Sequence, residues 1–183
     1  MELAGGIPLW VFPRGDLPTV VGSIVMPGGA GVQRPGEAGL AQLTAAMLDE
    51  GTSTRSAEQI ALAAESMGAT IDATCGWAGA YVSFKCLKSD FGESLELAAD
   101  ILRHATFPAH EWSRVRGQAV AALRAERDHA ESRAVRALLA AIYPDDHPYR
   151  FPLSGTEAGA QQLERSSLVD FHSQSLLSVR TLT

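Results

Sequence analysis

The spacing of apolar and polar positions predicts two strands at the start of the chain and a loop after them. β-Branched and aromatic residues fill IPLWVF (7–12) and TVVGSIVM (19–26), and the turn-forming sequence PRGDLP separates them. Both segments are typical of strands. The glycine- and proline-rich stretch 27–39 then predicts a loop.

Helices are expected next, over 38–49 and 57–67. Ser56 and Gln59 fit a capping box at the start of the second helix. The apolar stripe of the first helix consists of Leu40, Leu43, Met47 and Leu48.

Side chains alternate along both arms of residues 69–87, which predicts a β-hairpin turning near Trp77 to Gly79. Asp90, with Glu93 three residues later, is expected to cap a further helix. A long helix is expected to begin at Pro108. Its small face, which we expect to pack closely against a neighbour, consists of Ala119, Ala122 and Ala125.

The last part of the chain predicts helices over 132–142 and 167–177, with an irregular, proline-rich loop over 144–155 between them. Strands and helices in this order predict an α+β fold, in which a largely antiparallel sheet packs against several helices. We expect residues 1–183 to form one domain.

Composition excludes several classes of function. Hydrophobic residues make up 46% of the chain and charged residues 20%, as in ordinary globular proteins. The net charge is −6, and Lys and Arg cluster in no group larger than a pair, so nucleic-acid binding is not expected. No apolar run approaches the roughly 20 residues that span a bilayer.

The N-terminal sequence MELAGGIPLWVFPRG lacks the basic region and long apolar run of an export signal. The sequence as it stands therefore favours the cytoplasm, and a removed leader would instead place the protein in the periplasm. Cys75 and Cys86 lie on opposite arms of the predicted hairpin. Cys86 would face residue 69 or 70, roughly 20 Å along the strand from Cys75. Because a disulfide needs Cα atoms within about 7 Å, free thiols are expected.

Three segments together resemble the first domain of the insulinase/pitrilysin family of zinc peptidases, which includes the mitochondrial processing peptidase subunits. They are LPTVVGSIVMPGGAG, GEAGLAQLTAAMLDEGTSTRSAEQIALAAESMGATIDA and AAIYPDDHPYRFPLSGTE. The Gly-Leu-Ala helix, the Glu-Gly-Thr turn and the Tyr-Pro…His-Pro-Tyr…Gly-Thr-Glu loop are specific in combination. The resemblance covers essentially the whole chain, and it implies that a last strand and a homologous domain would follow.

In active family members the Gly-Leu-Ala helix continues into His-x-x-Glu-His. Its two histidines bind Zn²⁺ from one helical face, and its glutamate activates the metal-bound water. Carried onto this chain, the histidine positions are Gln42 and Ala46, and the glutamate position is Ala45. The third ligand position falls at Ala122, within AALR. The resemblance therefore implies no zinc, no other cofactor and no catalytic residue at these positions.

Other sites have weaker support in the sequence. His104 and His110 flank a predicted turn at a spacing that does not suit a helical metal site. His129 resembles an exposed residue at a helix end, and His172 a packing or surface histidine. The cluster Asp145, Asp146 and His147 leaves a metal site open, although the family carries a similar loop as structure. No Gly-x-Ser-x-Gly or phosphate-binding Gly-Lys-Ser/Thr motif is present.

Three functions remain open at this point. By resemblance, the chain would be the zinc-less half of a clamshell peptidase, which helps an active homologue, or the other half of the same chain, to hold a peptide. A second possibility is a structural subunit of a larger complex without proteolytic role. A third is an enzyme with an unrelated site. An unpaired sheet edge also predicts self-association.

Overall fold

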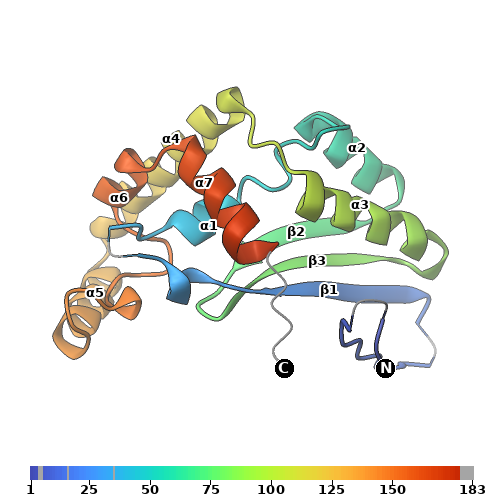
Figure 1. Ribbon diagram of the computed structural model, residues 1–183, viewed down its shortest axis with the longest axis horizontal. Coiled ribbons are helices and arrows are strands. Elements are labelled where there is room, and N and C mark those ends of the chain that lie inside the picture. The colour runs from blue at the N-terminus through green and yellow to red at the C-terminus, as the bar shows by residue number, and fades with distance from the viewer. Residues whose placement is uncertain (4–5, 16, 35, 178–183) are drawn as a thin grey trace.

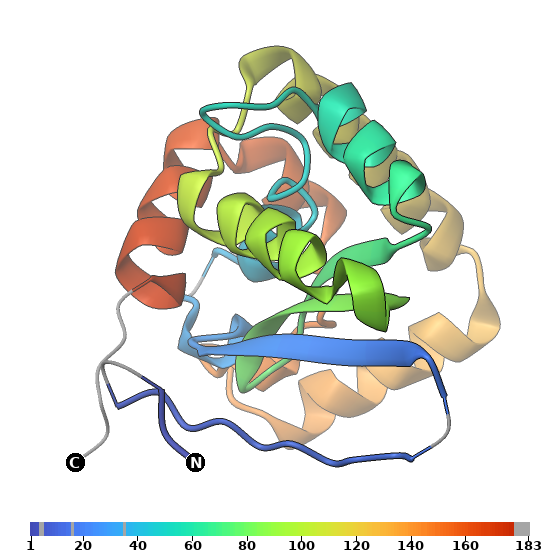
Figure 2. The ribbon, with the colours of Figure 1, turned by 90° about the vertical axis from the view of Figure 1, so that its right-hand side faces the viewer.

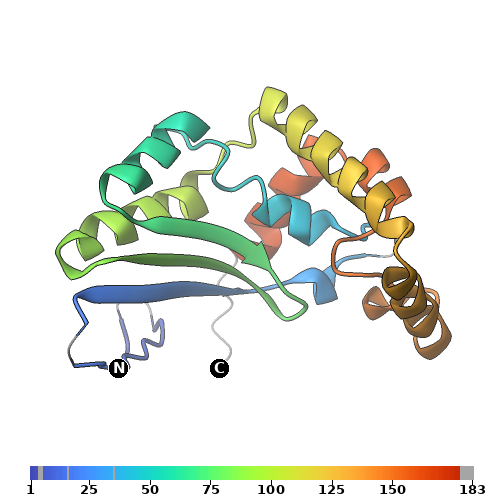
Figure 3. The ribbon, with the colours of Figure 1, turned by 180° about the vertical axis from the view of Figure 1, so that it is seen from behind.

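The computed structural model describes residues 1–3, 6–15, 17–34 and 36–177, and it has the expected α+β architecture. Three antiparallel strands form one sheet in the order β1-β3-β2. They are β1 (Thr19–Pro27), β2 (Thr70–Cys75) and β3 (Gly79–Leu87). Figures 1 and 3 show most of the helices gathered on one side of this sheet, and the N-terminal segment lying on the side of β1.

Seven α-helices and four short helical turns accompany the sheet in the described structure. The α-helices are α1 (Leu40–Ala45), α2 (Ala57–Ser66), α3 (Phe91–His104), α4 (Ala109–Arg127), α5 (Ala130–Ile142), α6 (Glu157–Gln162) and α7 (Arg165–Phe171). The short turns are η1 (Ala30–Val32), η2 (Lys88–Asp90), η3 (Pro148–Arg150) and η4 (His172–Leu176), the last with π-helical bonding.

Alternation along the strands separates a buried face from an exposed one. On β3, Val82, Phe84 and Cys86 are almost fully buried. They belong to the same core as Leu97 and Ile101 of α3, the helix that packs against β3 in Figure 2. The opposite face carries Val21, Ser23 and Val25 of β1, all exposed.

The predicted hairpin is confirmed, because β2 and β3 pair with Cys75 opposite Ala80 and Thr70 opposite Lys85. Cys86 therefore lies one position beyond the pair formed by Thr70. Both cysteines are free and buried, and burial raises the pKa of the Cys75 thiol to about 11.

The predicted strand at 7–12 is wrong. The segment instead folds back on the chain start, where the Leu3 amide donates to the Ile7 carbonyl and the Leu9 amide to the Met1 carbonyl, both at 2.8 Å. Trp10 and Phe12 are 73% and 82% exposed. A strand there would need a neighbouring strand to hydrogen-bond and a surface to cover its apolar side chains, and β1 pairs with β3 alone within the described chain.

The helix predicted over 38–49 is shorter than expected, although its apolar stripe is buried as predicted. After Ala45 the backbone bonding changes to that of a 3₁₀ turn, because the Met47 and Leu48 amides donate to the carbonyls three residues earlier. Met47 and Leu48 are adjacent and both fully buried. Because neighbouring positions on a helix point about 100° apart, ending the helix lets both side chains reach the core.

Three further expectations have mixed outcomes. The capping box of Ser56 and Gln59 is present at α2. Asp90 precedes α3, but its side chain makes no capping hydrogen bond. The alanine face of α4 is not buried as a whole, since Ala122 and Ala125 are exposed, and the helix packs through Trp112, Val115 and Leu123.

Gly29 lies where the loop after β1 meets the turn between β2 and β3. A Cβ atom placed on it would fall 2.2 Å from the Gly76 carbonyl oxygen and 2.5 Å from the Gly79 amide nitrogen. Its φ of −73° is available to any residue. The close approach between the loop after β1 and the hairpin turn therefore requires glycine for steric reasons alone.

We expect Gly29→Ala to lower the free energy of unfolding by about 1–3 kcal/mol, the usual cost of overpacking. Gly117→Ala is the matched control. Gly117 lies inside α4, where an added Cβ meets no atom within 4 Å. It should stabilise the protein by about 0.5–1 kcal/mol through helix propensity. Urea unfolding of both variants measures the change in the free energy of unfolding. An equal change in the two variants would contradict the packing argument for Gly29.

Candidate functional site

Helix α1 carries the positions at which the family resemblance places its zinc motif. The helix contacts β2, α4 and α7, and Figure 3 shows it beneath α4. Its N-cap is Gly39, in the left-handed conformation with φ of 98° and without a side-chain cap. The side chain of Gln33 caps the helix instead, because its Oε1 accepts from the Ala41 amide at 2.8 Å. The Nε2 of the same side chain donates to the Ala30 carbonyl at 3.0 Å.

A second close backbone contact holds the start of α1. A Cβ on Gly155 would lie 2.4 Å from the Ala38 carbonyl oxygen and 2.6 Å from the Gly39 Cα. Gly155 also has a φ of 85°, which glycine adopts without strain. The loop before α6 thereby packs directly against the entry to α1, and this contact explains the glycine in the Gly-Thr-Glu sequence.

The structure places the four predicted positions on two helices in contact with each other. Gln42 is half-buried in α1, Ala45 is fully buried at the end of that helix, and Ala46 is its exposed C-cap. Ala122 is an exposed residue of α4. The side chains of Ala45 and Ala46 thus face different surroundings, one the core and the other solvent.

Zinc does not fit these residues. Alanine offers no donor atom, and Gln42 offers an amide oxygen in place of imidazole or carboxylate. That oxygen is buried and has no hydrogen-bond partner among the described residues. Such an orphaned acceptor costs free energy without being a strong ligand. A structural zinc site, in contrast, requires three or four good ligands.

The other candidate residues form no alternative metal site. Within the described ranges, no three His, Cys, Asp or Glu side chains lie where they could hold a metal ion together. His147 stacks on Tyr143 and accepts from the Tyr149 amide at 3.1 Å, as expected of a structural loop. Asp145 pairs with Arg150 at 2.9 Å. The aromatic cluster of Tyr143, His147 and Tyr149 packs against Trp77 of the hairpin turn.

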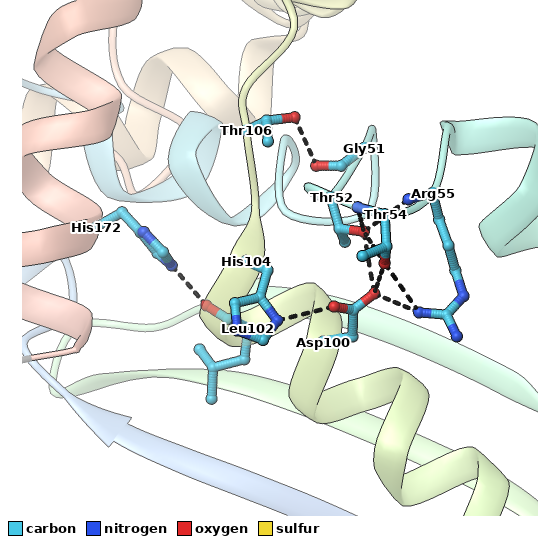
Figure 4. A network of polar contacts seen from close by, with 9 residues as sticks. All are labelled: Gly51, Thr52, Thr54, Arg55, Asp100, Leu102, His104, Thr106 and His172. Atoms are coloured by element: carbon cyan, nitrogen blue, oxygen red, sulfur yellow. Dashed lines mark hydrogen bonds and ion pairs between the residues drawn. The ribbon is translucent and has the colours of Figure 1, made fainter.

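The Glu-Gly-Thr turn is the centre of a polar network that joins it to α3 (Figure 4). Asp100 Oδ2 accepts from Thr52 Oγ1 at 2.9 Å and from Arg55 Nη1 at 2.6 Å, and Asp100 Oδ1 bonds His104 Nδ1 at 2.8 Å. Burial alone would raise the pKa of Asp100. The hydrogen bonds from His104, Thr52 and Arg55 outweigh burial and hold that pKa below its usual range.

The same turn is bonded to the start and the flank of α4. The Gly51 carbonyl accepts from the amide and the hydroxyl of Thr106, at 2.9 and 3.2 Å. Glu50 pairs with Arg114, which also donates to Glu111 at 2.7 Å. Sequence reasoning missed this network, although Asp100 and His104 stand four apart in the sequence, a spacing that brings side chains together on a helix.

His172 lies outside this network and beside it in Figure 4. Its Nε2 bonds the Leu102 carbonyl at 2.6 Å, and its ring lies edge-on to Phe107 at 5.3 Å. Burial lowers the pKa of His172, although the bond to Leu102 opposes this. The residue is therefore a packing histidine that joins η4 to α3.

An open depression of about 510 Å³ lies over the Glu-Gly-Thr turn. Residues 50–58 line it together with Thr106, Pro108, His110 and Glu111. Its lining includes none of the four positions to which the resemblance assigns the zinc motif. The depression is therefore separate from those positions.

Comparison with known proteins identifies the family. The family model described as Insulinase (Peptidase family M16) matches residues 18–157. This chain belongs to the insulinase family. An uncharacterized zinc protease of Rickettsia bellii is 22% identical over 170 residues, which are 93% of this chain and 41% of that protein. The chain thus spans less than half the length of this relative.

Several solved structures have the same fold as this chain. A peptidase M16 inactive domain from Pseudomonas fluorescens is 26% identical with a TM-score of 0.78, over 86% of this chain and 38% of that one. A protease from Helicobacter pylori is 18% identical with the same TM-score, over 86% and 38% of the two chains. Pitrilysin is 18% identical with a TM-score of 0.75, over 87% of this chain and 18% of that one. No helix in the described structure combines the length and hydropathy needed to cross a membrane.

Asp100→Asn should lower the free energy of unfolding at pH 7 by about 1–3 kcal/mol, because it removes the charge that Thr52, Arg55 and His104 bind. Since the folded pKa of Asp100 is depressed, its contribution is present above the unfolded value near 3.9 and is lost as the pH falls through the folded pKa. Urea unfolding at pH values from 7 down into the acid range measures this. The free energy of unfolding should fall less with decreasing pH in Asp100→Asn than in the wild type.

Asp128→Asn serves as the control for this measurement, because Asp128 is an exposed carboxylate at the end of α4. It should change stability by less than about 0.5 kcal/mol. If the free energy of unfolding fell equally with decreasing pH in the wild type and in Asp100→Asn, the role assigned to Asp100 would be contradicted.

Proposed function

We propose that this chain is a non-catalytic insulinase-family domain that acts as the zinc-less half of a clamshell peptidase. In this role it forms part of the wall around a peptide, while an active homologue, or the other half of a longer chain, supplies the metal and the catalytic glutamate. The observation that carries the proposal is the residue set on α1 and α4. By the family resemblance, the positions of the motif's His, Glu, His and Glu fall at Gln42, Ala45, Ala46 and Ala122.

The geometry of α1 supports a retained fold with an altered function. Its entry is held by Gln33 and by the contact of Gly155 with Ala38 and Gly39. The turn after it is held by Asp100. These interactions position the helix without requiring a metal ion. The similarity to a Pseudomonas fluorescens M16 inactive domain at 26% identity supports the same function.

An alternative proposal, a purely structural subunit, predicts a different partner and no effect on peptide cleavage. A homologue that carries His-x-x-Glu-His, taken from the same organism, distinguishes the two. Self-association of the chain stays a separate prediction, as do the last strand and the following domain that the resemblance implies.

The direct test mixes the chain with that homologue and measures cleavage of a fluorogenic unfolded peptide. The homologue's rate should rise with added chain and saturate near one chain per homologue. The chain alone should show no cleavage that a chelator abolishes. Heat-unfolded chain is the control. Chelator-sensitive cleavage by the chain alone would contradict the proposal, and so would a homologue that neither binds the chain nor responds to it.

We expect Gln42→His combined with Ala46→His and Ala122→Glu to introduce zinc binding, measured by calorimetry and by zinc content. The substituted positions lie on two helices in contact, and two of the three are exposed. Ala45 is left unchanged, because it is fully buried and an added carboxylate there would be costly. The control replaces Gln42 alone with His and should not bind zinc tightly, since one imidazole is not a site. Failure of the triple variant to bind zinc, while still folded, would show that the positions do not correspond to the family ligands.

A further inference from the structure

The loop between α5 and α6 contains a hydrogen bond that only a neutral histidine can accept. His147 is the N-cap of η3, and its Nδ1 lies 3.1 Å from the Tyr149 amide nitrogen. A backbone amide donates, so Nδ1 is the unprotonated, accepting nitrogen of the ring. An imidazolium ring carries a proton on both nitrogens and cannot accept this bond. We call residues 143–151 the His147 loop.

The capping bond positions a cluster of aromatic rings. The His147 ring stacks on Tyr143 at 4.8 Å and lies edge-on to Tyr149 at 5.2 Å. Tyr149 in turn lies 4.5 Å from the ring of Trp77 in the hairpin turn. All four residues are half-buried. A movement of the His147 ring would therefore disturb the contact between the His147 loop and the hairpin turn.

The hairpin turn and the His147 loop together support η1, the turn that precedes α1 in the chain. The Gly31 amide of η1 donates to the Trp77 carbonyl at 2.8 Å. The same turn also contacts η3 of the His147 loop. Gln33, which follows η1, caps α1 through the Ala41 amide. The His147 loop is thus connected, through η1, to the entry of the helix on which the resemblance places the zinc motif.

The charges around His147 come from its own loop and from α5. Within the loop, Asp145 pairs with Arg150 at 2.9 Å, and Asp146 is exposed and lines a small hollow together with Arg34. The charged residues of α5, which contacts η3, are Glu131, Arg133 and the half-buried Arg136, which lies 3.5 Å from Glu126 of α4. Neither η1 nor the hairpin turn at 76–78 carries a charge. Two carboxylates and one guanidinium give the loop a charge of −1, so a proton on His147 brings it to zero. Loss of the acceptor, and not repulsion between charges, is therefore what protonation imposes on the loop.

Two other histidines with bonded rings differ from His147 in this respect. His172 donates through Nε2 to the Leu102 carbonyl, a bond that a protonated ring keeps. His104 bonds the Asp100 carboxylate, and a charged ring strengthens that bond. Of these three histidines, His147 is the one whose bond is lost when its ring is protonated.

We infer that His147 is a pH-sensitive latch on its loop. The neutral ring accepts the Tyr149 amide and holds the His147 loop against Trp77 and η1. When Nδ1 takes a proton from solvent, the ring leaves the amide, and the loop loosens beside the entry to α1. Histidine is the side chain whose charge ordinarily changes between pH 5 and 8, which sets the range to be measured. The latch does not depend on the proposed function, because it involves only this chain's own loop.

Residue-resolved amide hydrogen exchange of the full chain, measured by NMR, tests the latch. The protection factor of an amide is the exchange rate in the unfolded chain divided by that in the folded protein at the same pH. For the Tyr149 amide it should fall about fivefold or more between pH 8 and 5, as for the loss of a capping bond. The Gly31 amide should lose protection over the same range, because the loop supports η1. The Val82 amide, in the buried part of β3, reports global destabilisation in acid and should lose less protection.

Substitutions at the cap separate the latch from other effects of acid. In His147→Asn the side-chain oxygen accepts the Tyr149 amide at every pH, so the acid-induced loss of protection should disappear. In His147→Ala no acceptor is present, so Tyr149 should already be poorly protected at the upper end of the pH range. His129→Asn is the matched control, because His129 is the N-cap of α5 and makes no side-chain capping bond. This control should keep the wild-type pH dependence at Tyr149.

A Tyr149 protection factor that changed with pH no more than that of Val82 would overturn the latch. An equal loss of protection in the wild type and in His147→Asn would overturn it as well. If Gly31 kept its protection while Tyr149 lost it, the connection from the loop to η1 would be wrong. Thermal unfolding checks that each variant folds, and the wild-type comparison of Tyr149 with Val82 decides the question without any variant.

Discussion

The Asp100 carboxylate is the interaction on which the arrangement around α1 depends. It binds Thr52, Arg55 and His104 at once and so attaches the turn after α1 to α3. Through Gly51 and Glu50 the same turn is bonded to Thr106 and to Arg114 of α4. Because α1 is only six residues long, its own backbone bonds stabilise it little, and its position is set by what holds its two ends.

Under the proposed function, this mode of support lets the insulinase-family fold persist in a chain that binds no zinc. An insulinase-family zinc site would add ligand bonds between α1 and α4, and losing them removes that contribution. In this chain the two helices stay in contact through packing and through the turn. Ala45 is buried, and Ala46 and Ala122 are exposed. Under the proposed function, these alanines belong to a surface that binds no ion. The unpartnered oxygen of Gln42 is the remaining polar group there.

Local patterns predicted much of this fold. β-Branched composition located β1, alternation located the hairpin, and the capping box located the start of α2, because each depends on residues close in the sequence. The failures depend on distant partners. Residues 7–12 have the composition of a strand, but no described strand pairs with them. The shortening of α1 follows from the burial of both Met47 and Leu48, which only the packed core imposes. The Asp100 network joins residues 45 to 48 positions apart and has no local signal beyond the pair with His104. The assignment of the zinc-motif positions rests on the family resemblance alone, since alanine and glutamine carry no signal of their own.

The proposed function requires that this insulinase-family domain has no zinc site of its own. Elemental mass spectrometry on tag-free wild-type protein, exchanged into metal-free buffer and then offered equimolar zinc, tests it most directly. We expect zinc far below one ion per chain after gel filtration. Zinc near one ion per chain would contradict it and would direct attention to Asp145, Asp146 and His147, or to His104 and His110.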